Sequence, residues 1–361
     1  MTETDTLERP LTKVLPGAID CDIHPRSPKL DDLMPHLDAY WRDMLPERDI
    51  DRLELTTMPT SIGSWALPGG TDGVQDAASL GKSLLDPTGV SAGILNLVNG
   101  VQALYDPYMS TAICQATNRW LASDWLDRDP RLRAGLVIPF RNPEAAAEEI
   151  NRYRDDKRFV QIIALAMGEA PLGRRDFWPI YRAAAEAGFA LNIQPGSIYR
   201  ASPTQSGYLS SLVEEQVHQT QGFASQIASL LAEGVFTEFP EMKTVLAGSG
   251  AGWLFGLSWR MAKDWRGARV EVPWIKDSPD DIIARQVRMT IRPLDAPPDP
   301  ADGAELIDCI GSPDMLLYSS DYPRAHPDAP GTWPAEIPAE YAAQICKANA
   351  LATYPRLEVT P

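Results

Sequence analysis

The sequence has few cysteines, no long apolar run and a shortage of positive charge. Its four cysteines (Cys21, Cys114, Cys309 and Cys346) lie far apart without C-x-x-C spacing, so neither a zinc knuckle nor a disulfide framework is indicated. No apolar run of about 18 residues occurs and residues 1–20 contain no signal-peptide core, so we expect a soluble, cytoplasmic protein without a membrane partner. The formal net charge of -16 argues against nucleic acid and anionic lipid as partners.

Short apolar runs recur along the whole chain. Eight of them read as strands: residues 18–24, 91–97, 132–139, 158–165, 189–195, 243–249, 287–293 and 315–323. Stretches with helical spacing separate most of these runs, for example residues 142–156 and 174–188, where Gly188 suits a helix end. The alternation predicts an α/β fold, a (β/α)8 TIM barrel, with a doubly wound parallel sheet as the alternative.

One barrel domain is expected over residues 1–361. Three segments depart from a minimal barrel: an N-terminal arm at residues 1–16, an insertion at 26–90 after the first strand, and a long helical region at 205–233 after the fifth. Long insertions on a barrel usually cover the active face or form a contact between subunits.

The first predicted strand, in "IDCDIHP" (residues 19–25), carries several polar groups. Because side chains alternate along a strand, Asp20, Asp22 and His24 are expected to point one way, with Asp22 and His24 at the C-terminal mouth of the barrel. A buried carboxylate needs a cation or hydrogen bonds, and the neighbouring imidazole makes a divalent metal ion the candidate. The alternative is that Asp22 caps the next loop and His24 is an ordinary hydrogen-bonded histidine.

The last predicted strand, "MLLYSSDYP", ends in another charged group, Asp321. In a barrel the eighth strand lies beside the first, so Asp321 is expected to face Asp22 and His24. The three groups together predict a metal or proton-transfer site in which Asp321 moves the proton.

Three stretches, "IDCDIHP", "LLAEGVFTEFPEMKTVLAGSGAGWL" and "LLYSSDYPRAHPDAP", resemble the amidohydrolase superfamily over essentially the whole chain. The resemblance is to the amidohydrolase-related group that includes decarboxylases of aromatic and semialdehyde acids. It implies a divalent metal ion, Zn²⁺ first with Mn²⁺ or Fe²⁺ as alternatives, held by Asp22, His24 and Asp321. It also implies a small carboxylate or amide substrate that is hydrolysed or decarboxylated.

The sequence departs from the family pattern at two places. The fifth strand carries Gln194 where the resemblance leads us to expect a histidine ligand, and His218 on the following helix is predicted to supply the missing nitrogen. The alternative for His218 is packing on an amphipathic helix. In "SDYPRAHPD", Arg324 replaces the histidine of the usual "SDYPHWD", and His326 follows two residues later, so Asp321, Arg324 and His326 are the predicted catalytic residues.

Two arginines and one amide are candidates for binding the substrate. Arg292, which ends the seventh strand, and Arg324 have the planar guanidinium that suits a carboxylate. The alternative is that they pair with Asp22, Asp321 or Asp328. Gln194, at the fifth strand, is the second predicted substrate-binding residue beside Arg292.

Three functions stay open at this point. The first is an active metal-dependent hydrolase or lyase. The second is a supporting subunit whose chemistry lies in a partner barrel, since this sequence resembles the less complete chain of a two-chain amidohydrolase-fold oxygenase acting on 2-aminoisobutyrate. The third is a metal-free scaffold in which Arg324 or Arg292 holds Asp22 and Asp321. In each case we expect a homo-oligomer or a hetero-oligomer with another amidohydrolase-fold chain.

Overall fold

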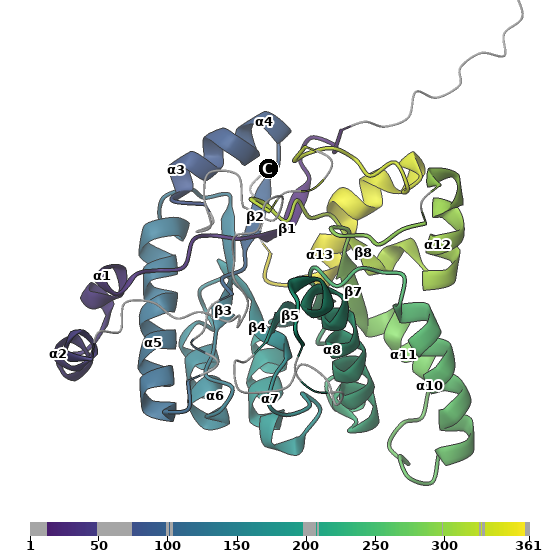
Figure 1. The fold of residues 1–361 in the computed structure, drawn as a ribbon, viewed down its shortest axis with the longest axis horizontal. Coiled ribbons are helices and arrows are strands. Elements are labelled where there is room, and N and C mark those ends of the chain that lie inside the picture. The colour runs from purple at the N-terminus through teal and green to yellow at the C-terminus, as the bar shows by residue number, and fades with distance from the viewer. Residues whose placement is uncertain are drawn as a thin grey trace, which may run out of the picture.

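The fold is a ring of parallel strands surrounded by helices (Figure 1). The computed structural model describes residues 13–48, 74–98, 101, 104–197, 207, 209–297, 299–324, 326 and 329–357. Within these residues one eight-stranded sheet runs in chain order: β1 (Ile19–Ile23), β2 (Ala92–Leu95), β3 (Leu132–Val137), β4 (Phe159–Met167), β5 (Ala190–Ser197), β6 (Thr244–Leu246), β7 (Val287–Thr290) and β8 (Leu316–Leu317). Every strand overlaps one of the predicted apolar runs, which confirms the strand assignments.

The first and last strands meet and close the barrel. Ile23 and Tyr322 form a parallel bridge, and the Cys21 and His24 amides donate to the carbonyl oxygens of Tyr318 and Tyr322 at 2.9 and 2.8 Å. A doubly wound sheet would leave β1 and β8 apart, so that alternative is wrong and the (β/α)8 barrel is confirmed.

Helices cover the outside of the ring, with α5, α6 and α7 side by side along one part of it (Figure 1). The helices of the described residues are α1 (Leu30–Leu33), α2 (Ala39–Glu47), α3 (Ala77–Leu80), α4 (Asp86–Thr88), α5 (Pro107–Trp120), α6 (Pro143–Arg152), α7 (Trp178–Ala187), α8 (Leu212–Ala232), α9 (Val235–Glu238), α10 (Leu254–Ala268), α11 (Pro279–Gln286), α12 (Gly303–Ile310) and α13 (Asn349–Thr353). As expected, α7 ends at Gly188, whose φ of 76° lies in the left-handed region that favours glycine.

The departures from a minimal barrel are partly described. The insertion at 26–90 contains α1 to α4, and its residues 49–73 lie outside the described residues, as do residues 1–12 of the arm. The helical region at 205–233 is mainly α8, while Asp328, a predicted partner for the arginines, is also outside the described residues. No helix in the described ranges is long and apolar enough to cross a membrane.

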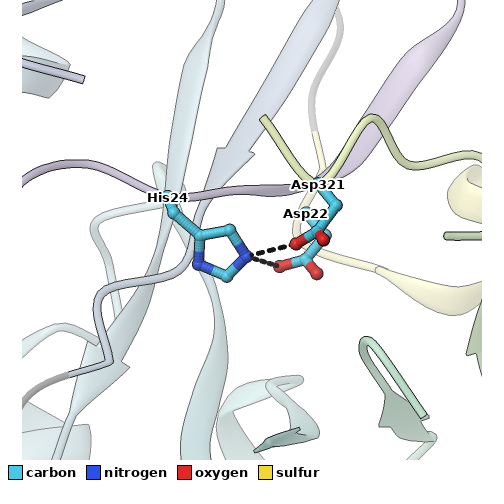
Figure 2. Close-up of side chains that lie close together, drawn as sticks. All are labelled: Asp22, His24 and Asp321. Carbon is cyan, nitrogen blue, oxygen red and sulfur yellow. Dashed lines mark hydrogen bonds and ion pairs between the residues drawn. The ribbon is translucent and has the colours of Figure 1, made fainter. Parts of the chain in front are cut away.

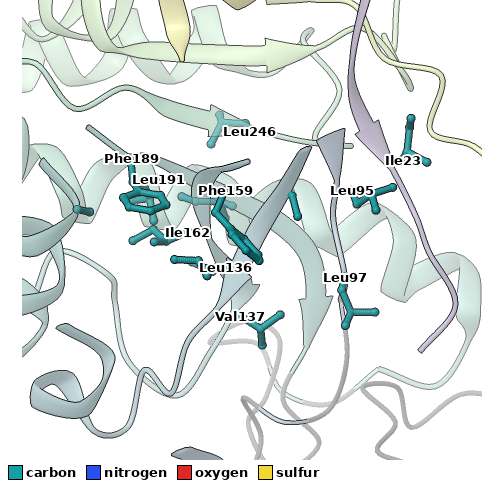
Figure 3. Packing of buried hydrophobic residues seen from close by; sticks show 14 of the residues in the cluster. Ile23, Leu95, Leu97, Leu136, Val137, Phe159, Ile162, Phe189, Leu191 and Leu246 are labelled. Carbon is teal, nitrogen blue, oxygen red and sulfur yellow. The ribbon is translucent and has the colours of Figure 1, made fainter. Parts of the chain in front are cut away.

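Two hydrophobic clusters hold the barrel together. The larger one joins outward-facing strand residues such as Ile23 and Leu191 to the surrounding helices (Figure 3). The smaller cluster comprises Ile19, Cys21, Ala92, Ile94, Val160, Ala190, Val245, Leu317, Ala350, Tyr354 and Leu357. Its members come from six strands and the C-terminal segment, so we place it inside the barrel. The register of β1 against β2 shifts between Asp20 and Ile23, which breaks the regular alternation expected along this strand.

Arg356 anchors the C-terminal segment at the N-terminal end of the barrel strands. Its side chain is buried and lies over the Phe189 ring at 3.9 Å. The guanidinium donates to five carbonyl oxygens, those of Phe159 (2.6 Å), Arg154 (2.8 Å), Ala187 (2.7 Å), Tyr153 (2.9 Å) and Asp156 (2.7 Å). These carbonyls precede or begin β4 and β5, so the segment after α13 crosses the N-terminal end of the barrel, opposite the mouth.

Candidate metal centre

Three predicted side chains meet at the mouth of the barrel. Asp22 and His24 come from the C-terminal end of β1, and Asp321 follows β8 (Figure 2). One ligand atom from each residue lies within 4.8 Å of the other two, and all three residues are buried. The closure of β1 on β8 therefore assembles a group with the donor types of a metal site.

His24 presents one ring nitrogen to the two carboxylates. Its Nε2 lies 2.8 Å from Oδ1 of Asp321 and 3.5 Å from Oδ1 of Asp22 (Figure 2). Its Nδ1 lies 3.2 Å from the backbone oxygen of Asn96 and donates there, which leaves Nε2 as the ligand atom once it is deprotonated. Burial and the Arg324 charge disfavour the imidazolium, but Asp22 and Asp321 outweigh them and raise the pKa of His24 to about 9.

Asp22 is fully buried and only half satisfied. Its Oδ1 accepts hydrogen bonds from Asn96 Nδ2 at 2.7 Å and from Gln194 Nε2 at 3.0 Å. Its Oδ2 has no hydrogen-bond partner in the part of the chain that the structure describes. A buried carboxylate oxygen without a donor is costly, and a bound cation would remove that cost.

Asp321 receives three positive or donating groups. Its Oδ1 accepts from Arg324 Nη1 at 3.1 Å as well as from His24, and its Oδ2 lies 2.8 Å from Nε2 of His326. Burial would raise the pKa of Asp321, but Arg324 and the two histidines outweigh it and hold the pKa well below its usual range. Asp321 also has a φ of 55°, a left-handed conformation that aspartate tolerates better than most residues.

The donor set fits a divalent cation. Two carboxylates and one imidazole suit Mn²⁺, Fe²⁺ and Zn²⁺, and among the described residues no hydrogen-bond donor occupies Oδ2 of Asp22. The arrangement can therefore hold an ion against a substrate oxygen at the mouth.

Comparison with known proteins identifies the family of the chain. A family model described as amidohydrolase matches residues 19–356. The chain belongs to the amidohydrolase family. In the structure of this amidohydrolase the cluster lies at the C-terminal end of β1 and β8, the end at which TIM-barrel enzymes carry their active sites.

Curated relatives that are similar to this amidohydrolase include decarboxylases. Gamma-resorcylate decarboxylase of Rhizobium sp. (strain MTP-10005) is 28% identical over 206 residues, which cover 53% of this chain and 60% of the relative. The enzyme of the same name from Rhodococcus jostii (strain RHA1) is 28% identical over 220 residues, covering 55% and 63%. The chain thus spans about 60% of the length of the curated relatives it matches.

Solved structures share the fold of this amidohydrolase. The 5-carboxyvanillate decarboxylase of Sphingomonas paucimobilis superimposes with a TM-score of 0.65 at 20% identity, over 94% of this chain and 98% of that one. A dihydroxybenzoic acid decarboxylase of Polaromonas sp. JS666, solved with bound manganese and the inhibitor 2-nitroresorcinol, gives 0.65 at 19% identity, over 94% and 97%.

The other predicted residues of this amidohydrolase lie at varying distances from the cluster. Gln194 contacts Asp22, while Arg324 and His326 contact Asp321, so Arg324 makes the charge pair that was the alternative to substrate binding. Arg292 is buried and its Nη2 donates to the Thr332 carbonyl at 3.0 Å. His218 lies on α8 and is not a member of the ligand group, although its Nδ1 is buried without a hydrogen-bond partner among the described residues.

Three polar residues at the site were not predicted. Asn96 follows β2 and contacts both Asp22 and His24, and Gln161 of β4 donates to Asn96. Asp20 was expected to share a face with Asp22, but no role was assigned to it. Its Oδ1 accepts from the Ser320 and Asp22 amides, and burial raises its pKa to about 7. The available sequence signal was weak: one asparagine at the end of an apolar strand and one glutamine inside another.

Proposed function

We propose that this chain is a metal-dependent lyase that removes CO2 from a small hydroxylated aromatic acid. The observation that carries the proposal is the buried group of Asp22, His24 and Asp321 at the barrel mouth, in which Oδ2 of Asp22 has no hydrogen-bond partner among the described residues. Hydrolysis and decarboxylation both suit such a group. Decarboxylation is favoured because the curated relatives are named gamma-resorcylate decarboxylase.

A divalent ion is the proposed cofactor, held by Asp22, His24 and Asp321 with His218 as the predicted fourth ligand. When bound, such an ion draws electron density from a substrate oxygen and so makes a carbanion-like transition state accessible. Zn²⁺ is the ion expected from the sequence, and Mn²⁺ is supported by the manganese in the similar Polaromonas structure. The cluster's two carboxylates are compatible with either ion.

Side chains of the protein would bind the substrate and supply the proton. Arg324, whose side chain is 39% exposed, would exchange its pair with Asp321 for the substrate carboxylate, and Arg292 is the second predicted binding group. The bond between the ring carbon and the carboxyl carbon breaks, CO2 leaves, and the electron pair stays on the ring carbon. That carbon then takes one proton from the pair formed by His326 and Asp321, which lie 2.8 Å apart.

The test is an activity assay with defined metal content. We expect the protein loaded with Mn²⁺ or Zn²⁺ to release CO2 from 2,6-dihydroxybenzoate or 5-carboxyvanillate. Protein from which the metal has been removed with a chelator should release none. Amide and ester substrates are assayed in parallel. Metal-dependent hydrolysis without CO2 release would replace the lyase by a hydrolase, and the absence of bound metal under all conditions would contradict the site itself.

A supporting subunit is the second candidate, and one observation favours it. The fifth-strand position of the expected histidine ligand holds Gln194, whose Nε2 donates to Asp22, so the ligand set is smaller than the family resemblance implies. Native mass spectrometry of the chain, purified alone and after co-expression with its genomic neighbours, distinguishes the lyase from the supporting subunit. Near-stoichiometric metal and activity in the lone chain support the lyase, whereas metal bound only in complex with a second barrel chain supports the subunit.

A further inference from the structure

A chain of two buried amides leads from the barrel interior to Asp22. Gln161, on β4, is fully buried and its Nε2 donates to Oδ1 of Asn96 at 2.6 Å. Asn96, just after β2, is also fully buried, and its Nδ2 donates to Oδ1 of Asp22 at 2.7 Å. The order is therefore Gln161 to Asn96 to Asp22, across three strands.

Asn96 holds the end of β1 at several points. Its amide N–H donates to the Ile23 carbonyl at 2.8 Å, and its Nδ2 also reaches the Cys21 carbonyl at 3.1 Å. Its own carbonyl receives Nδ1 of His24 at 3.2 Å. One residue thus contacts both ligands that β1 contributes, Asp22 through the side chain and His24 through the backbone.

The Cys21 carbonyl and Asp22 set which way the Asn96 amide faces, and Gln161 supplies the donor that this orientation needs at Oδ1. A side-chain amide has a donor end and an acceptor end, and turning it by 180° exchanges them. Because Gln161 donates to Oδ1, the acceptor end of Asn96 is occupied and its donor end must face Asp22. The reversed amide would place an oxygen against a carboxylate, without a proton between them.

The backbone leaves room for this arrangement. A Cβ on Gly135 of β3 would lie 3.3 Å from Oδ1 of Asn96 and 2.6 Å from Cγ1 of Ile163. Any larger residue at 135 would therefore press on the pair of amides from the neighbouring strand.

We propose that Asn96 and Gln161 are positioning residues that orient Asp22 for metal binding, an inference that rests on the proposed metal site. Asn96 Nδ2 and Gln194 Nε2 both donate to Oδ1 of Asp22, so the carboxylate is held in one orientation, and its Oδ2 has no hydrogen-bond partner among the described residues. Partners that fix metal ligands in this way typically contribute tenfold to a hundredfold to metal affinity.

The test is a double-mutant cycle in which Mn²⁺ affinity is measured by titration calorimetry. Each protein is first treated with a chelator and dialysed to remove bound metal. Asn96→Leu removes the side-chain amide but keeps both backbone contacts, and we expect it to weaken Mn²⁺ binding by about tenfold or more. Gln161→Met should weaken binding in the same direction but less. The double variant should bind Mn²⁺ no more weakly than Asn96→Leu alone, because Gln161 acts only through Asn96.

A matched control separates orientation from loss of core stability. Gln286 is another fully buried glutamine, whose Nε2 donates to the carbonyls of Phe236 and Pro240 at 2.9 and 2.8 Å. Gln286→Met should lower the melting temperature but leave Mn²⁺ affinity unchanged. Asn96→Ser, which keeps a small polar group, replaces Asn96→Leu if the leucine variant does not fold.

The outcomes distinguish this inference from the proposed function. Mn²⁺ binding by the unaltered chain with equal binding by the Asn96 and Gln161 variants would overturn the positioning role and leave the metal site standing. Additive losses in the double variant would also overturn the serial arrangement. If the unaltered chain binds no divalent ion, the proposed function fails first and this inference falls with it.

Discussion

At the scale of single residues, the site depends on how Asp321 is surrounded. Two histidines and Arg324 approach its two oxygens between 2.8 and 3.1 Å. Arg324 is the only fixed positive charge among them, and in the presence of a cation it and the ion would share the same carboxylate. The Arg324 charge therefore affects how strongly Asp321 can bind a cation.

Replacing Asp321 by asparagine should abolish most metal binding without unfolding the protein. The amide carries no charge and turns a donor toward His326 or His24, so we expect Mn²⁺ affinity to fall by about a hundredfold or more. Arg324 is partly exposed and can turn to water, so the circular dichroism spectrum should not change. Unchanged metal content and turnover would remove Asp321 from the site. Asp32→Asn, which breaks the Arg26 pair at 2.6 Å in the insertion, is the matched control and should bind metal normally.

Gln194 offers a change in the opposite direction. Gln194→His would place an imidazole beside Asp22, at the position where the family resemblance implies a ligand. Because imidazole suits Zn²⁺ better than Mn²⁺, we expect Zn²⁺ affinity to rise by about tenfold and Mn²⁺ affinity to change less. Gln194→Met, which only removes the hydrogen bond to Asp22, is the comparison. Identical metal binding by the two variants would show that side chains at 194 do not reach the ion.

Side chains of the cluster could be predicted from the sequence where a charge interrupts an apolar strand. Asp22, His24 and Asp321 could be grouped because each ends a strand and because barrel closure brings β1 to β8. Asn96 and Gln161 could not, since a neutral amide inside a strand has the same sequence appearance whether it serves a ligand or only the core. Their contact joins residues 65 positions apart and depends on the register of β2, β3 and β4.

At the scale of elements, strand ends were predictable but local irregularities were not. The shift in β1 between Asp20 and Ile23 separates the inner cluster, which contains Ile19 and Cys21, from Ile23 in the outer cluster. A strict alternation along the strand would have put these residues on one face. The sequence contains no signal for such a shift, because it arises from the pairing with β2.

The helix α8 provides the element-scale test of the predicted fourth ligand. His218 lies on this helix with a buried Nδ1, outside the present ligand group, so its side chain or the helix must move for His218 to bind the ion. If it does bind, His218→Ala should lower metal affinity by about tenfold. The control is His36→Ala. His36 lies in the insertion, with its Nε2 4.0 Å from Oδ2 of Asp124, and its replacement should not change metal affinity. Equal affinity of the two variants would exclude His218 from the ligand set.

At the scale of the whole molecule, the two ends of the barrel have different tasks. The mouth gathers the ligands, whereas the opposite end is closed by the C-terminal segment through Tyr354, Leu357 and Arg356. The barrel itself was predictable from eight apolar runs alternating with helical spacing. The closure was not, because an arginine near the end of a sequence gives no indication that five backbone carbonyls surround it.

Arg356 should therefore govern stability without touching the chemistry. Arg356→Met leaves buried carbonyls before β4 and β5 without a donor, and we expect the free energy of unfolding to fall by about 3 kcal/mol or more, measured by urea denaturation. Arg356→Lys keeps the charge but not the planar fork that reaches several carbonyls at once, so its loss should be intermediate. Arg260→Met removes an exposed arginine paired with Asp264 at 2.7 Å on α10 and should leave the urea midpoint of unfolding nearly unchanged. Mn²⁺ affinity of the folded Arg356 variants should equal that of the unaltered chain, because the metal cluster lies at the other end of the strands. A loss of affinity as large as the loss of stability would mean that the two ends of the barrel are not independent.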